Sequence, residues 1–129
     1  MSALEKGRYP GQVGIDAYGN GGFRFADMSH KGSLLCLPEG MQGWSVTSVA
    51  ELTLESLSPV LAQAANLDVL LIGLGTDIVA IDPAIRQALR DQKIIIEATQ
   101  TGGAVRTYNV LLAEERAVGA ALIAVEKAR

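Results

Sequence analysis

The segment from residue 67 to residue 109 constrains the fold most, because it predicts strand, helix, strand and helix in succession. Residues 67–72 are almost continuously apolar, which is typical of a strand covered on both faces in a largely parallel sheet. Residues 94–97 form a second such run, and the pair Asp82-Pro83 marks the start of the helix between them. We therefore predict an α/β fold in which the two strands are central, parallel and joined by a right-handed crossover.

The other segments extend this prediction to the rest of the chain. Residues 9–46 hold most of the glycines among short apolar runs, which predicts short strands and tight turns, with a hairpin turn at residues 19–22. A phosphate loop is the alternative there, although no strand-to-helix transition follows. One helix is expected from the pair Ser58-Pro59 and another from Thr101, its N-cap. Residues 117–125 favour a buried strand, with a helix as the alternative.

Composition disfavours several classes of protein. A chain of 129 residues suits a single domain over residues 1–129. Its net charge of −3 gives no reason to expect a nucleic-acid partner, and its only cysteine, Cys36, excludes an internal disulfide. No apolar segment approaches the ~20 residues of a membrane-spanning helix, and residues 1–8 lack the apolar core of a signal peptide. We expect a cytoplasmic protein that does not span a membrane.

The carboxyl ends of the two predicted strands supply a candidate ligand pocket. In open α/β sheets ligands bind outside these strand ends, which is where the turns at residues 73–77 and 99–103 lie. The exposed amides of a glycine-rich helix start suit an anion, an arginine would neutralise it, and an acid at a strand end would serve as a base. The predicted pocket residues are Gly73, Gly75, Glu97, Thr99, Thr101, Gly102, Gly103 and Arg116.

The same turns also have a purely structural interpretation. Gly73 and Gly75 could shape a tight turn, and Thr99 and Thr101 could satisfy backbone amides. The dinucleotide-binding fingerprint is absent, because residue 78, where a third glycine would stand, is isoleucine. The sequence leaves both ligand binding and turn formation open.

No cluster of residues predicts catalysis or metal binding. His30 lies in a loop-like stretch without a cysteine or acid at ligand spacing, so we expect a surface histidine. Cys36 stands between apolar residues without a charged neighbour, which predicts a buried and inert thiol. Trp44 and Tyr108 are expected in the core. The sequence predicts no catalytic residue, no cofactor and no bound metal.

Several short stretches, in their order along the chain, resemble one known family. They are residues 15–19, residues 32–35, Pro38, Trp44, residues 70–75, Glu97 with Thr99 and Thr101, and Ala104 with residues 107–109. Together they resemble the domain of mitochondrial complex I assembly factor 3, which the adipogenesis-associated domain protein and many small bacterial and archaeal proteins share. The resemblance extends from about residue 9 to residue 125. It implies a three-layer β+α/β/α domain with a central mixed five-stranded sheet, the last strand antiparallel to the others.

The resemblance also directs the functional prediction. It implies no established enzymatic activity, and the best-understood relative assists assembly of respiratory complex I. We predict a non-catalytic binding module that assists the assembly or stability of a membrane-associated complex such as complex I. Its partner would be a protein, such as a membrane-complex subunit or insertion component, and the chain a monomer or weak homo-oligomer. The alternative is a small-anion-binding protein or an enzyme that uses the pocket at the strand ends.

Overall fold

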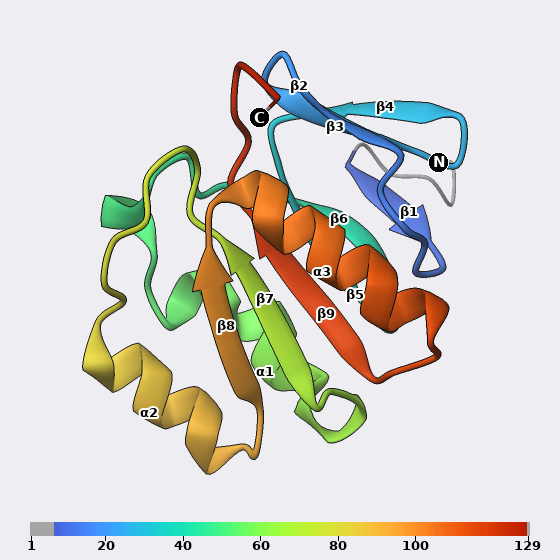
Figure 1. The fold of residues 1–129 in the computed structure, drawn as a ribbon. Coiled ribbons are helices and arrows are strands. Elements are labelled where there is room, and N and C mark those ends of the chain that lie inside the picture. Colours follow the sequence, from blue (N-terminus) through green and yellow to red (C-terminus); the bar gives the residue numbers. More distant parts are fainter. Residues whose placement is uncertain (1–6, 129) are drawn as a thin grey trace.

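A six-stranded mixed sheet forms the centre of the molecule (Figure 1). The computed structural model describes residues 7–128. The prediction that residues 1–8 contain no signal peptide therefore falls mostly outside the described residues. Across the sheet the strands are β1 (Arg8–Pro10), β6 (Gly40–Trp44), β5 (Ser33–Leu37), β9 (Val118–Leu122), β7 (Val69–Gly73) and β8 (Ile95–Thr99). The predicted α/β class is confirmed.

A smaller three-stranded sheet lies against one face of the larger one. It consists of β2 (Ala17–Gly19), β3 (Gly22–Phe25) and β4 (Met28–Lys31), paired antiparallel in that order. Asn20 and Gly21 have φ values of 52° and 76°, the left-handed conformations that a two-residue hairpin turn requires. The predicted hairpin turn at residues 19–22 is confirmed.

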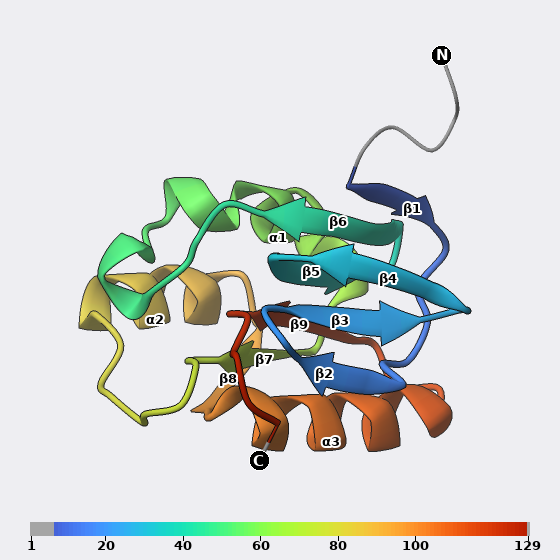
Figure 2. The ribbon, with the colours of Figure 1, turned by 90° about the horizontal axis from the view of Figure 1, so that it is seen from above.

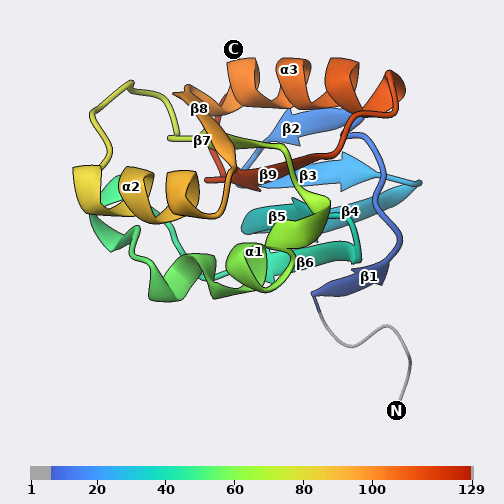
Figure 3. The same cartoon turned by 90° about the horizontal axis from the view of Figure 1, so that it is seen from below.

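Helices cover both faces of the six-stranded sheet (Figure 2). The longest, α3 (Thr101–Ala113), shares one face with the small sheet, while α1 (Ser58–Ala62) and α2 (Pro83–Asp91) lie on the other (Figure 3). Three 3-10 turns flank α1, namely η1 (Val49–Glu51), η2 (Glu55–Leu57) and η3 (Ala64–Asn66). Each face has its own apolar core, with Phe25 and Tyr108 in one and Trp44 and Leu89 in the other. These layers agree with the β+α/β/α arrangement that the resemblance implies.

Two details of the expected sheet are wrong. The sheet has six strands rather than five, because residues 8–10 add β1 to the edge of β6. The last strand, β9, is antiparallel to β5 but parallel to β7, which is itself parallel to β8. The physical reason is that α2 and α3 each return the chain to the same end of the sheet, so that β7, β8 and β9 all run in one direction.

The predicted parallel pair is present, but only one of its strands is central. Val69 of β7 pairs with Ile95 of β8, and β8 is an edge strand. The central place beside β5 belongs to β9, whose small residues suit it: a Cβ at Gly119 would approach the carbonyl oxygen of Cys36 to 3.1 Å. All five residues of β9 are buried, which confirms the strand predicted within residues 117–125.

The helix starts follow the predicted signals in part. At α2 the Asp82 Oδ1 accepts a hydrogen bond from the Ala84 N–H at 2.9 Å, which confirms this cap. Helix α1 begins at Ser58 itself rather than after it. Helix α3 begins at Thr101, and Gln100 occupies the N-cap position. Thr101 is not the cap that we predict, because its hydroxyl bonds to other segments.

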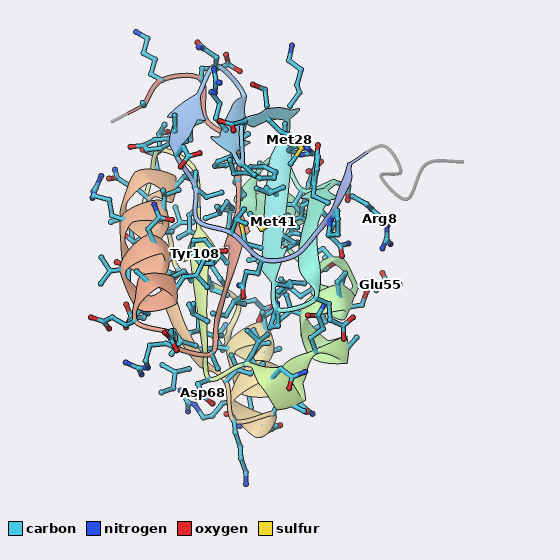
Figure 4. All side chains as sticks on the ribbon, turned by 90° about the vertical axis from the view of Figure 1, so that its right-hand side faces the viewer. Arg8, Met28, Met41, Glu55, Asp68 and Tyr108 are labelled. Atoms are coloured by element: carbon cyan, nitrogen blue, oxygen red, sulfur yellow. The ribbon has the colours of Figure 1, made fainter. Side chains whose placement is uncertain are left out.

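Both predicted core anchors are buried. The Tyr108 hydroxyl donates a hydrogen bond to the Val13 carbonyl oxygen at 2.7 Å, and Figure 4 shows Tyr108 beside α3 and Met41 over the strands of the sheet. Trp44 is 8% exposed, and its Nε1–H donates to the Ser56 carbonyl oxygen at 2.8 Å. Each aromatic residue thus buries its ring while its polar atom keeps a partner.

Candidate functional site

A groove with a volume of about 960 Å³ opens at the carboxyl ends of β7 and β9. Its lining comes from residues 47–49, residues 74–77, the start of α3 at Gln100 and Gly102, residues 123–127, Tyr18 and Val79. These segments are far apart in the sequence, and the ends of the parallel strands bring them together. Carboxyl ends of parallel strands are also where open α/β sheets bind their ligands.

The side chain of Thr101 fixes the shape of this groove. Its hydroxyl donates a hydrogen bond to the Ile123 carbonyl oxygen at 2.6 Å and accepts one from the Gly75 N–H at 3.0 Å. The Thr101 N–H donates to the Gly75 carbonyl oxygen at 2.9 Å. Because Thr101 is fully buried, it joins the turn after β7, the start of α3 and the end of β9 from within.

Gly73 and Gly75 meet two different requirements of the turn after β7. A Cβ at Gly73 would lie 2.9 Å from the Cα of Thr101, closer than packed carbon atoms approach one another. Gly75 has a φ of 93°, a conformation that glycine adopts far more readily than other residues. The structure of the turn therefore explains why glycine stands at both positions, and Gly75 also lines the groove.

Gln100 lines the groove, although its residue pattern does not predict it as a pocket residue. Its Nε2–H donates a hydrogen bond to the Thr76 carbonyl oxygen at 2.6 Å. Next to it the Thr99 carbonyl oxygen accepts from the Leu74 N–H at 2.8 Å. These bonds hold the two predicted turns together. The only sequence signal at Gln100 is that it is a polar residue directly before a helix. Its hydrogen-bond partner, Thr76, can be identified only once the order of the strands is known.

Besides Gly73 and Thr101, which are described above, four more of the predicted pocket residues lie at or beside the groove. Gly75 and Gly102 belong to its lining. Thr99 and Gly103 lie just outside the lining, where a Cβ at Gly103 would come within 3.1 Å of the Thr99 Cγ2. The two predicted turns therefore do meet at one concave surface.

The remaining two predicted residues lie elsewhere. Glu97 is exposed on the edge strand β8 and is not part of the groove lining. Arg116 is exposed two residues before the start of β9. Since β9 and β7 are parallel, a residue before β9 lies at the amino ends of the strands, opposite the groove. Arg116 is therefore not placed to neutralise an anion bound beside Gly102.

The groove is mainly apolar and slightly acidic. Asp77 and Glu126 contribute two carboxylates to the lining, and Lys127 contributes one ammonium group. A surface with more carboxylates than cations repels a small anion. The lining suits an apolar or basic group better than phosphate or sulfate.

Residues 15–123 match a family profile described as "Protein of unknown function (DUF498/DUF598)". The chain belongs to this family. The match begins just before β2 and includes every later helix and strand, so β1 alone among the strands lies outside it. The DUF498/DUF598 match ends at Ile123, so the groove-lining residues 124–127 lie outside the matched part of the chain.

Relatives of this DUF498/DUF598 member resemble nearly the whole chain. An uncharacterised protein of Rhodobacter capsulatus is 37% identical over 123 residues, covering 95% of this chain and 93% of that protein. The NADH dehydrogenase (ubiquinone) 1 alpha subcomplex assembly factor 3 of Mus musculus is 31% identical over 121 residues, covering 94% of this chain. The chain spans 65% of the mouse protein's length. The predicted resemblance to the mitochondrial assembly factor is confirmed.

A solved structure shows the same fold. The crystal structure of an outer membrane protein from Bartonella henselae has a TM-score of 0.88 and 50% sequence identity, covering 92% of this chain and 99% of that one. In the present member of the DUF498/DUF598 family, none of the helices between residues 7 and 128 has the length and apolar character needed to cross a membrane.

His30 is buried in this DUF498/DUF598 member, so the expectation of a surface histidine is wrong. It is 9% exposed, with Nδ1 2.9 Å from the Tyr9 hydroxyl and Nε2 3.0 Å from the Ser33 carbonyl oxygen. Because a carbonyl only accepts, Nε2 carries a proton, and in the neutral ring Nδ1 accepts the hydrogen bond from the Tyr9 hydroxyl. The alternation of β4 turns His30 inward opposite Phe23. This alternation over residues 28–31 is the signal that identifies the buried histidine.

Cys36 is a buried thiol, as the sequence predicts. It is fully buried, and this burial raises the pKa of the thiol. Burial likewise raises the pKa of the neighbouring Tyr108 hydroxyl. Both groups therefore stay protonated at neutral pH, when neither serves as a nucleophile or a base. Among residues 7–128, no three His, Cys, Asp or Glu side chains are grouped so as to hold a metal ion.

Proposed function

We propose that this chain is a non-catalytic binding module that assists the assembly of a membrane-associated protein complex, with respiratory complex I as the leading case. The similarity to the mouse assembly factor over 94% of the chain carries this proposal. It extends over the whole domain rather than over one motif. Because a shared fold does not define a function by itself, the surface of the groove matters as well.

Exposed apolar side chains beside the groove support a protein partner. Ile78 is 65% exposed and Val79 is 44% exposed, both on the loop between β7 and α2. Val79 also lines the groove. Apolar side chains exposed at the rim of an apolar groove are typical of a surface that docks another protein.

The occupant proposed for the groove is an apolar segment of a complex subunit or insertion component, with a basic residue near the carboxylates of Asp77 and Glu126. Gly75 and Gly102 carry no side chains, which allows such a segment to approach the backbone of both turns. The proposed location is the cytoplasm, which the unpaired thiol of Cys36 favours.

Genetic complementation in the cell of origin tests this function. Deletion of the gene should lower the amount of assembled complex I in the membranes, measured on native gels. Val79→Asp should restore less complex than the wild type, because a carboxylate at the rim opposes an apolar segment. Ala65→Asp is the matched control, since Ala65 is exposed and lies outside the groove lining. It should restore complex I fully.

Site-specific photo-crosslinking identifies the partner in the same strains. A photoreactive amino acid at position 79 should capture a complex I subunit or an assembly component, and the same group at position 65 should not. Normal complex I levels in the deletion strain would contradict the assembly function. Equal rescue by Val79→Asp and Ala65→Asp would show that the groove is not the surface involved.

A further inference from the structure

Strand β8 lies at one of the two edges of the six-stranded sheet. This strand pairs with β7 on one side, and no strand within residues 7–128 pairs with its other side (Figure 1). The opposite edge strand, β1, has three residues and ends in Pro10, which has no N–H to donate. In contrast, β8 has five residues without glycine or proline. An edge of this kind is a template for another strand.

Two backbone hydrogen bonds define which residues of β8 face β7. The Ile95 N–H donates to the Asp68 carbonyl oxygen at 2.8 Å, and the Thr99 carbonyl oxygen accepts from the Leu74 N–H at 2.8 Å. In a parallel pair, every second residue of a strand directs its backbone groups to the neighbouring strand. Residues 95, 97 and 99 therefore bond to β7.

Ile96 and Ala98 consequently direct their N–H and C=O groups away from β7. Within the described part of the chain, no backbone hydrogen bond outside the sheet involves either residue. Both residues pack their side chains against the core between α2 and the sheet, so the backbone of this edge is held in an extended conformation. It offers two donors and two acceptors in a fixed row.

The exposed side chains along the β8 edge are one apolar residue and one acid. Ile95 and Glu97 pair with Val69 and Leu71, which belong to the core beneath α3, so both lie on the α3 face of the sheet. Ile95 is 62% exposed, and Glu97 is also exposed. The edge thus presents an apolar side chain and a carboxylate side by side on one face.

We infer that the β8 edge binds an extended polypeptide segment by strand addition, with a basic residue opposite Glu97 and an apolar residue opposite Ile95. Backbone hydrogen bonds to Ile96 and Ala98 would supply affinity, and side chains on the shared face would supply selectivity. Residues directly opposite each other on neighbouring strands share a face, where opposite charges attract.

A second copy of this chain fits the edge less well. If two β8 strands pair antiparallel so that Ile96 of one copy bonds with Ala98 of the other, the two Glu97 carboxylates stand directly opposite each other. Like charges at opposed positions destabilise a strand pair. A different polypeptide with a positive charge at the position opposite Glu97 avoids this repulsion, and it is the occupant that we infer.

A designed peptide tests the inference with the full chain. The probe is Thr-Val-Thr-Arg-Thr-Val-Thr, and its control has glutamate in place of arginine. Binding of the probe should slow hydrogen exchange of the Ile96 and Ala98 amides, followed by NMR. The arginine peptide should bind about tenfold more tightly than the glutamate peptide, and Glu97→Arg should reverse this order. Unchanged exchange at both amides, or equal affinity for the two peptides, would overturn the inference.

Two matched variants separate the backbone contribution from the side chains. Ala98→Pro removes an N–H that β7 does not use, whereas Ala98→Val retains it. The proline variant should bind the arginine peptide about tenfold more weakly than the valine variant, and equal binding would overturn the inference. If Ala98→Pro does not fold, the reversal by Glu97→Arg decides, because Glu97 is exposed. Protection of the same amides that rises with protein concentration alone would indicate a second copy and also overturn it.

Discussion

Thr101 shows how one side chain can fix a surface formed by three segments. Thr101→Val keeps the shape of the residue but leaves the Gly75 N–H and the Ile123 carbonyl oxygen without their partner. Buried polar groups left unpaired cost about 1–3 kcal/mol each, so the free energy of unfolding should fall by about 2–6 kcal/mol. Urea denaturation measures this loss.

The control for this residue is Thr101→Ser, which keeps the hydroxyl and removes one methyl group. It should lose only about 1 kcal/mol, the contribution of a buried methyl. If the valine variant were as stable as the serine variant, the two hydrogen bonds would not be what stabilises the groove.

The secondary-structure elements that the sequence predicts well are those with a local signal. Continuous apolar runs identify β7 and β8, and Asp82 identifies the start of α2 through its own cap. The positions of these elements in the sheet have no such local signal. The placement of β9 beside β5 depends on the close approach at Gly119, and the exposure of Ile95 on β8 follows from that strand order.

The cap of α2 gives a prediction that depends on this one element. Asp82→Ala removes the acceptor of the Ala84 N–H and should lower the free energy of unfolding by about 1 kcal/mol. Asp82→Asn keeps an acceptor at the same place and should stay within a few tenths of a kcal/mol of the wild type, since asparagine caps helices as well as aspartate does. Thermal denaturation of both variants checks this, and equal losses would show that charge rather than capping matters.

The groove could be predicted only in part because it belongs to the molecule as a whole. Gly75 and Gly102 follow from the rule that parallel strands bind ligands at their carboxyl ends. Residues 47–49 and 123–127 carry no pattern that distinguishes them as groove residues, and they reach it through the strand order. The two sheets also meet here, since the Gly21 N–H donates to the Val125 carbonyl oxygen at 2.9 Å.

The segment after β9 should therefore stabilise both the groove and the contact between the sheets. Deleting residues 124–129 removes the buried Val125 and the acceptors of the Asn20 and Gly21 N–H groups. The free energy of unfolding should fall by about 2–4 kcal/mol, from lost apolar burial and lost hydrogen bonds. Hydrogen exchange at Asn20 and Gly21 should accelerate together, whereas deleting only residues 128–129 should leave both amides protected. If both amides stayed protected in the longer deletion, the small sheet would be held in place without this segment.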